Sequence, residues 1–328
     1  MEKFMKWGGW LGLLFVLAVA PRFLGIVKTN LVVEFAIGAL YAASLNILLS
    51  YTGLLSFGHA LFFGAGAYTA ALLLTHVEHM PLIPVVLAGG AAAVIMALVL
   101  SPLLVRVRDT AFSMLTLAFG QLMYVVCLKF REITGGEDGL SMFPIPALHL
   151  PGLAPFDMTD PRNFYYLCLA AVSLCLFLMW YFTKTPLGQV MVGIRDNQVR
   201  VGYLGYRAPL TKAVIFSVSG GFAGIAGALY ALFQNVVSTD GVLSVLVSFK
   251  PIMTILVGGI GTFIGPVVGC GALIMVEEIT SRFTERFELV SGLVFIGVIL
   301  FAPYGLVGTY RHIRFRLAER RTAREARA

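Results

Sequence analysis

The sequence predicts an all-α integral membrane protein, a polytopic helix bundle with about 8–10 transmembrane segments. Composition is the first reason: 59% of the 328 residues are hydrophobic and 12% are charged, about half the charged fraction of a soluble domain. The second is a set of apolar runs without Asp, Glu, Lys or Arg, each near the ~20 residues that a helix needs to cross a bilayer. These runs are 82–105, 111–128, 164–182 and 289–306. The third is a pair of glycine-broken apolar segments, one in each half of the chain, which indicates re-entrant helices and an inverted repeat.

Apolar segments of this kind recur along the whole chain. The first has features of a signal peptide, because Lys3 and Lys6 precede an apolar run that ends in Ala-Val-Ala at 18–20. Pro21 follows directly and disfavours cleavage, so we interpret this segment as an uncleaved span. We expect the segments at 7–25, 31–50, 60–75, 82–105, 110–130, 164–183, 212–235, 249–279 and 288–308.

The distribution of positive charge predicts the orientation. Seven arginines lie in the tail 311–328 and further basic residues in 184–212, whereas the loop 131–163 carries more acidic than basic residues. We therefore expect cytoplasmic termini, one transmembrane domain over 1–310, and a basic cytoplasmic tail over 311–328 that lies against membrane lipid. The tail lacks the interleaved aromatic residues of single-strand binders, so the net charge of +7 does not indicate nucleic acid.

The long segment 249–279 is predicted to be a broken hairpin or re-entrant pair. Seven crossings from a cytoplasmic start leave 236–248 outside, and one span, 288–308, separates segment 249–279 from the cytoplasmic tail. The segment must therefore return to the side that it left, and the glycines of 258–261 interrupt it near its middle. Irregular backbone at this depth is tolerated where protein or a water-filled cavity surrounds it.

A second glycine-broken segment, 53–68, lies in the first half. Interrupted segments in corresponding halves indicate a translocation pathway at the repeat interface, although glycines also serve close helix packing. We prefer the packing interpretation for Gly220, Gly224 and Ala228, which follow each other at four-residue spacing. We expect His59 to cap or hydrogen-bond the broken backbone rather than to handle protons. The predicted pathway residues are Ser56, His59, Tyr68, Thr116, Gly258, Gly259 and Gly261.

Several functional classes are disfavoured by what the sequence lacks. The expected spans hold no Asp or Glu between their flanks, since Glu34, Glu277 and Glu278 lie at span ends; this disfavours an ion-coupled carrier with carboxylates at depth. No hydrolase or zinc-protease motif occurs, so we do not expect an enzyme. The four cysteines lie in apolar segments without a Cys-x-x-Cys pair, so we expect no metal and no cofactor. No phosphate-binding loop occurs, so ATP-driven transport would need separate ATPase subunits.

The stretch 184–206 is predicted to form a short amphipathic helix on the cytoplasmic side. Thr185 is suited to the N-cap and Pro186 to the first helical position. The apolar residues of this stretch recur at helical spacing on one face. They are Leu187, Val190, Met191, Ile194 and Val201. Such a helix lies on lipid headgroups or docks in the groove of a partner.

Nearly the whole chain resembles the LivM-type permeases of branched-chain amino-acid ABC importers. The resemblance rests on motifs that occur in order and at family spacing. They are 53–68 (GLLSFGHALFFGAGAY), 116–121 (TLAFGQ), 134–140 (TGGEDGL), 194–197 (IRDN), 222–230 (FAGIAGALY), 258–269 (GGIGTFIGPVVG) and 303–308 (PYGLVG). Within 184–206 the chain departs from the family, with Gln189 for a usual Arg, Gln198 for a usual Glu and Arg200 for a usual Ala.

The resemblance implies a permease subunit of an importer for branched-chain or related small amino acids in the bacterial inner membrane. Its implied partners are a LivH-like sister permease, two ATP-binding subunits and a periplasmic substrate-binding protein. Residues 184–206 would be the coupling helix that docks on an ATPase, with Gly188, Arg195, Asp196, Asn197 and Gly205 matching the motif. The alternative is a stand-alone ion-coupled carrier or channel. The solute stays open between leucine, isoleucine or valine and urea, an amide or an aromatic acid.

Overall fold

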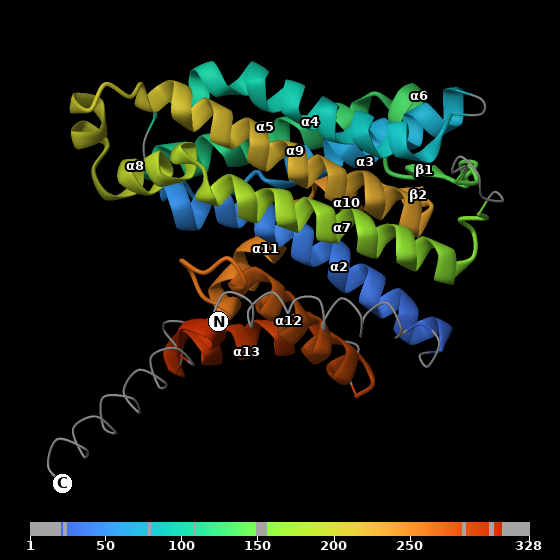
Figure 1. Cartoon of the computed structure of the whole chain (residues 1–328). Helices are drawn as coiled ribbons and strands as arrows, with labels where there is room; N and C mark the ends of the chain where they lie inside the picture. Colours follow the sequence, from blue (N-terminus) through green and yellow to red (C-terminus); the bar gives the residue numbers. More distant parts are fainter. Residues whose placement is uncertain are drawn as a thin grey trace, which may run out of the picture.

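A computed structural model describes residues 21, 25–77, 80–107, 109–148, 156–283, 287–301 and 305–309. These residues form helices α2–α13, one π-helix (η2) and two short strands (Figure 1). Six helical stretches are long and apolar enough to cross a membrane, which confirms the predicted all-α polytopic fold. The expected first span, 7–25, and the basic tail lie outside the described residues.

The first described span joins α2 (Ile26–Asn46) to the π-helix η2 (Ile47–Thr52) and ends at Gly53, whose φ of 73° is left-handed. Because the helix begins at Ile26, Glu34 lies inside the span. The prediction that acidic side chains are confined to span ends is therefore wrong at this position. The Glu34 side chain is exposed on the chain surface and interacts electrostatically with Lys250 of α11.

Three helices form the most closely packed part of the molecule: α3 (Ala60–His76), α4 (Leu82–Leu104) and α9 (Ala208–Gln234). Glycines allow their backbones to touch. A Cβ atom on Gly66 of α3 would lie 2.0 Å from the carbonyl oxygen of Gly224 in α9, and one on Gly224 would lie 2.4 Å from the Cβ atom of Ala93 in α4. The packing interpretation of Gly224 is thus confirmed.

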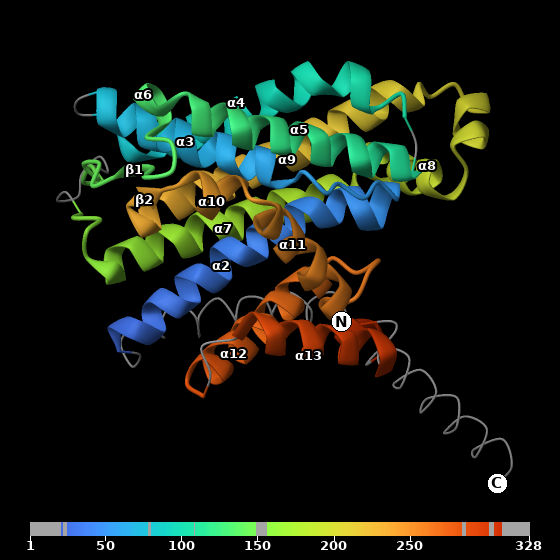
Figure 2. The same ribbon diagram turned by 180° about the vertical axis from the view of Figure 1, so that it is seen from behind.

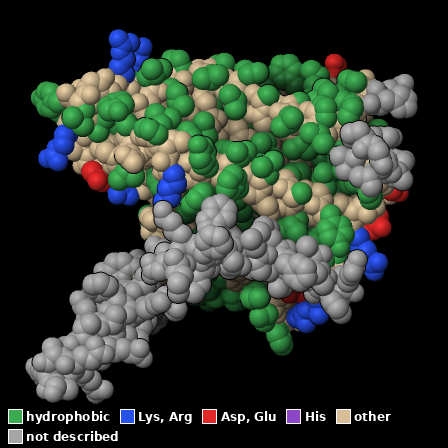
Figure 3. Space-filling view, in the orientation of Figure 1, with side chains coloured by type: hydrophobic (Ala, Val, Ile, Leu, Met, Phe, Trp, Pro, Cys, Tyr) green, Lys and Arg blue, Asp and Glu red, His purple; other side chains and the backbone are tan. Residues whose placement is uncertain are grey.

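Two further long helices, α5 (Asp109–Lys129) and α7 (Pro161–Lys184), flank this group. Large apolar side chains stay exposed along α4, α5 and α7, as expected for lipid-facing helices. Figure 3 shows this apolar surface between the two ends of the bundle.

The two ends of the bundle differ in structure and charge. At one end, α6 (Arg131–Thr134) and β1 (Leu140–Ser141) follow α5, and β1 pairs antiparallel with β2 (Val236–Val237) beside α10 (Thr239–Leu243). The acidic loop and the segment after α9 therefore lie at the same end, in agreement with the topology expected from charge. At the opposite end lies α8 (Pro186–Tyr203) (Figure 1).

The segment expected over 249–279 is a helical hairpin of α11 (Val245–Gly258) and α12 (Gly265–Ser281), followed by α13 (Phe287–Phe301). A Cβ atom on Gly258 would lie 1.8 Å from the carbonyl oxygen of Gly265, and one on Gly269 would lie 2.0 Å from that of Thr254. These contacts pair the two helices antiparallel, which confirms the predicted broken hairpin. Figures 1 and 2 show α12 and α13 on the α2 side of the bundle.

Candidate functional site

The first broken segment runs from Gly53 to the start of α3 without helical structure. Its backbone groups bond to side chains of α5: the Leu55 carbonyl accepts from Ser113 Oγ at 2.7 Å, and the Phe57 N–H donates to Thr116 Oγ1 at 3.2 Å. A Cβ atom on Gly58 would lie 1.8 Å from the Thr116 carbonyl oxygen, so the segment lies directly on α5. These bonds explain how irregular backbone is accommodated at membrane depth.

His59 lies at the start of α3, level with Ser44 of α2. The Ser44 Oγ donates to the Tyr41 carbonyl at 2.6 Å and therefore accepts from His59 Nε2, 2.9 Å away. This assignment leaves a lone pair on His59 Nδ1, which has no hydrogen-bond partner among the described residues. The prediction that His59 caps or bonds broken backbone is wrong, because the bond that its ring makes goes to a hydroxyl group of the neighbouring helix.

Ser56 is the second polar residue of this segment without a satisfied side chain. Its Oγ has no hydrogen-bond partner in the described part of the chain, and Ser56 and His59 are both 0% exposed. Unsatisfied polar atoms in a buried site are unusual and call for an explanation in function or ordered water. Neither side chain is accessible to solvent in this conformation.

The second broken segment is the tip of the hairpin, between Gly258 and Gly265. Gly259 and Gly261 have φ values of 117° and 82°, which side chains with a Cβ atom rarely adopt. The Gly261 N–H donates to Ser50 Oγ at 2.9 Å, and the Thr262 carbonyl accepts from Asn46 Nδ2 at 3.1 Å. The tip of the second-half hairpin is therefore held by the end of the first-half span.

The first broken segment and the start of α3 also contact α11, the first helix of the hairpin. Phe57 stacks on Phe249 of α11 with ring centroids 5.3 Å apart, and the Ala60 N–H donates to Ser248 Oγ at 3.0 Å. Six of the predicted pathway residues thus lie in or against the two broken segments. Ser56, His59 and Thr116 belong to or contact the first segment, and Gly258, Gly259 and Gly261 lie at the hairpin tip, which bonds to the end of η2.

Tyr68 lies apart from this group. It follows His59 by nine residues along α3, or about 13 Å at the helical rise. Its hydroxyl donates to Thr239 Oγ1 at 2.9 Å, and that hydroxyl in turn donates to the Gly136 carbonyl at 2.8 Å. Tyr68 therefore joins α3 to α10 and to the loop after α6, at the end of the bundle that carries β1 and β2.

Helix α8 begins as the sequence predicts. The Thr185 Oγ1 accepts from the Gly188 N–H at 3.3 Å, with Pro186 in the first turn. A Cβ atom on Gly188 would lie 2.3 Å from the Thr183 carbonyl oxygen, so the tight turn from α7 requires glycine here. Met191, Ile194 and Val201 are buried, which confirms the predicted apolar face.

A kink divides α8 at Asn197, where φ is −160° and ψ is 97°. The Asn197 Oδ1 accepts from the Arg200 N–H at 3.0 Å and acts as an N-cap for the last turns. The sequence analysis missed this kink, because the apolar spacing continues across it. Gly205 follows the helix with a φ of 86° and open space around it, so its role is conformational.

Arg195 connects α8 to the end of the first span. Its Nη1 donates to the Ser50 carbonyl of η2 at 2.6 Å, and its Nε donates to Asp196 Oδ1 at 3.2 Å. Ser50 and Asn46 were not singled out from the sequence. Their signal was present, because they are polar residues four positions apart, on one helical face, in an otherwise apolar run.

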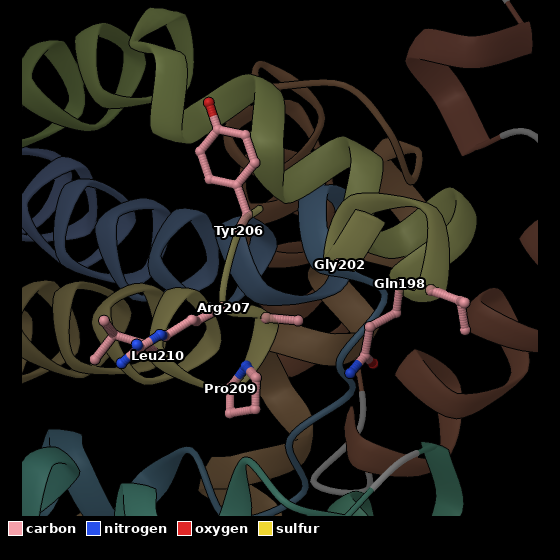
Figure 4. Close-up of a pocket in the computed structure, with 8 residues that line it drawn as sticks. Gln198, Gly202, Tyr206, Arg207, Pro209 and Leu210 are labelled. Carbon is pink, nitrogen blue, oxygen red and sulfur yellow. The ribbon is translucent and has the colours of Figure 1, made fainter. Parts of the chain in front are cut away.

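A hollow of about 480 Å³ lies between the end of α8 and the start of α9. Figure 4 shows Pro209 and Leu210 on one side and Gln198 on the other, with Tyr206 projecting away. Gln198, one of the departures from the family pattern, accepts from Lys212 Nζ at 2.9 Å. Basic side chains and exposed apolar groups thus share this end of the molecule.

Comparison with known proteins places the chain in a family. The model for the branched-chain amino acid transport system permease component matches residues 28–303. The chain belongs to that family. It is 28% identical over 282 residues to the LivM permease of the high-affinity branched-chain amino acid transport system of Escherichia coli K12, a match that covers 80% of this chain and 66% of that protein. The chain thus spans just under two thirds of that relative's length.

Relatives of both permease types occur. The chain is 26% identical over 300 residues to a probable branched-chain amino acid transport permease, LivH, of Methanocaldococcus jannaschii, covering 86% of this chain and 90% of the relative. It is 20% identical over 303 residues to the probable LivM of the same organism, covering 80% and 83%. No solved structure matches the chain.

Proposed function

We propose that this chain is the permease subunit of an ATP-binding-cassette importer that moves branched-chain or related small amino acids across a bacterial inner membrane. The observation that carries the proposal is the placement of α8, an exposed amphipathic helix whose Arg195 bonds directly to the end of the first membrane span. The family and the names of its relatives support the solute class.

The partners follow from the same reasoning. Similarity to both LivM and LivH permeases supports a second, related permease beside this chain. The chain carries no phosphate-binding loop, so two ATP-binding subunits would supply the energy. A periplasmic binding protein would capture the solute, and 1–310 would form one transmembrane domain between cytoplasmic termini, with 311–328 as a basic tail.

In this proposal α8 is the coupling helix. Closure of the ATPase pair moves α8, and the two permeases rock between outward- and inward-facing states, which ATP can drive because it binds the two states with different affinity. The kink at Asn197 directs the last turns of α8, and the hollow beside Gln198 offers a recess for an apolar side chain of the ATPase.

The proposed pathway passes the junction of the two broken segments. Ser56 Oγ and His59 Nδ1 would become available to the solute as the segments part, with Thr116 and the glycines at 258, 259 and 261 bordering the opening. Tyr68 would act nearer the outer end. Glu34 weakens the sequence argument against an ion-coupled carrier, yet the family supports the importer.

The first test is the composition of the assembled complex. We would purify the tagged chain in mild detergent from a host that carries its partner genes and identify the co-purified chains by mass spectrometry. We expect a second permease and two ATPase subunits. A chain that purifies alone, with uptake that follows an ion gradient, would contradict the proposal and favour a stand-alone carrier.

A charge reversal tests the role of α8. Asp196→Lys or Arg195→Glu should uncouple ATP hydrolysis from uptake and leave assembly intact, because both charges lie at the exposed face of α8. Glu278→Lys is the matched control, since it breaks the exposed Glu278–Arg282 ion pair (2.7 Å) in α12, away from α8. Normal uptake by both α8 variants would exclude the docking role.

A further inference from the structure

Ser50 makes hydrogen bonds on two sides of η2. Its carbonyl oxygen accepts from Arg195 Nη1 of α8 at 2.6 Å. Its hydroxyl group accepts from the Gly261 N–H of the hairpin tip at 2.9 Å and donates to Asn46 Oδ1 at 2.5 Å. Asn46 Nδ2 then reaches the Thr262 carbonyl at 3.1 Å. One residue thus contacts both the proposed coupling helix and the second-half hairpin, which is 211 positions away in sequence.

The Arg195 guanidinium group of α8 meets Ser50 at the C-terminal end of η2, where a cation is favoured. The last carbonyl groups of a helix lack intrahelical partners and carry the negative end of the helix dipole. A guanidinium group that donates to such a carbonyl makes a charge-assisted bond. The Cγ atom of Arg195 also lies 3.1 Å from the position that a Cβ atom on Gly53 would occupy, so the side chain covers the end of η2. Arg195 is therefore a direct physical link between α8 and this end of η2.

The side chains that hold the hairpin tip are buried, whereas Gly261 itself is exposed. Asn46, Ser50 and Thr262 are 1%, 2% and 7% exposed. The tip directs the Gly261 N–H and the Thr262 carbonyl toward the end of the first span, and such backbone groups are costly to leave without a partner. Asn46 and Ser50 supply partners for both groups. Loss of these bonds would favour a different position of the tip.

The π-helix provides a structural element whose rearrangement would move the hairpin tip. A π-helical turn has i→i+5 bonds, is rare, and occurs frequently at functional sites. A change of its local register rotates a residue about the helix axis and moves its carbonyl and its side chain together. At Ser50 that rotation would strain the bond to Arg195 and the bond to Gly261 at the same time.

We infer that Ser50, with Asn46, is the joint through which α8 positions the tip of the α11–α12 hairpin. Displacement of α8 by the ATPase is transmitted through Arg195 to the Ser50 carbonyl, and the Ser50 and Asn46 side chains release or hold Gly261 and Thr262. Both are positioning residues that contact no solute. The inference rests on the proposed coupling role of α8 and goes beyond it by naming the path to the second half of the chain.

The neighbouring residue Thr52 provides a matched control. It is also a buried hydroxyl residue of η2, at 4% exposure, but its Oγ1 donates to the Leu48 carbonyl within the same helical segment. Ser50→Ala and Thr52→Val therefore each remove one buried hydroxyl group from η2, and of the two only Ser50→Ala removes a hydrogen bond to the hairpin, the one from the Gly261 N–H. Ser50→Thr restores a hydroxyl group, and Asn46→Leu removes the second side chain of the joint.

The test uses the complete transporter in proteoliposomes, with ATP hydrolysis and uptake of radiolabelled leucine measured on the same samples. Ser50→Ala and Asn46→Leu should lower the amount of leucine moved per ATP by about tenfold, within the usual range of coupling between sites. Thr52→Val should match the parent, and Ser50→Thr should recover most of the loss. The double variant Arg195→Met/Ser50→Ala should move as much leucine per ATP as the more severe single variant. The effects of two substitutions on one path of coupling are not additive.

Each other outcome has a definite meaning. If Arg195→Met uncouples transport but Ser50→Ala and Asn46→Leu do not, α8 couples by another route and this inference is overturned while the proposed function stands. If both joint variants fail to assemble, or if Thr52→Val has the same effect, the contacts are structural and the inference is again overturned. If the parent complex moves no amino acid with ATP, the proposed function itself fails.

Discussion

A methyl group placed between the two helices of the hairpin should destabilise the molecule. The Cβ atom of Gly269→Ala would lie 2.0 Å from the Thr254 carbonyl oxygen and 2.8 Å from the Gly258 nitrogen. These atoms belong to the backbone and cannot rotate away, so α11 and α12 must separate by roughly 1.5 Å to reach ordinary contact distance. We take the cost at the upper part of the overpacking range, about 3 kcal/mol. Alanine returns about 1 kcal/mol as a better helix former, which leaves a net loss of about 2 kcal/mol.

The assay is thermal unfolding of the purified chain in detergent, followed by size-exclusion chromatography. A loss of about 2 kcal/mol corresponds to a Tm decrease of about 4–8 °C for a large domain. Gly297→Ala in α13 is the matched control, because among the described residues no atom outside its own stretch of helix lies within 4 Å of its Cβ position, and it should unfold at or above the parent Tm. Equal Tm values for the parent and Gly269→Ala would refute the reasoning. So would an equal decrease in both variants.

Three further predictions concern other parts of the chain. Asn197→Ala removes the cap on the Arg200 N–H and should cost about 1 kcal/mol locally, seen as faster amide hydrogen exchange after the kink of α8 and unchanged exchange before it. The Thr159 backbone N–H and hydroxyl hold the pKa of the Asp157 carboxyl below its usual range. The turn before α7 should therefore be stable above the usual carboxyl pKa and lost as pH falls through the lowered one, with Asp157→Asn abolishing this pH dependence of exchange. The four buried thiols should resist maleimide in the folded chain and react in denaturant, as read by mass spectrometry; labelling of all four without denaturant would contradict their burial. They are Cys127, Cys168, Cys175 and Cys270.

Most of the span positions could be predicted from sequence, because apolar length and glycine breaks act locally. The start of α8 was also predictable, since Thr185 and Pro186 together determine a helix N-terminus. The first described span was misjudged at its start. A hydropathy pattern treats Glu34 as a boundary, whereas in the structure Glu34 lies inside the span, within electrostatic reach of Lys250 of another helix.

The sequence indicated the segments that form the candidate site, but it did not indicate which residues of other helices are their hydrogen-bond partners. Polar residues in a glycine-broken apolar segment identified Ser56 and His59. The partner of His59 is Ser44 of the preceding helix, and the partner of the Ser50 hydroxyl is a backbone N–H in the opposite half of the chain. Such pairings depend on how helices cross, and spacing along one helix carries no information about them. The kink at Asn197 was missed for a related reason, because a side-chain cap can interrupt a helix without changing its apolar pattern.

The hairpin tip has a consequence for biogenesis. During synthesis, α2 leaves the ribosome more than 200 residues before Gly261 and Thr262 do. Within lipid, these backbone groups would be costly to leave without partners. Asn46 and Ser50 are synthesised first and supply those partners, so we expect the hairpin to complete its insertion against the amino-terminal half. Substitutions at Asn46 should consequently increase quality-control proteolysis of the newly made chain.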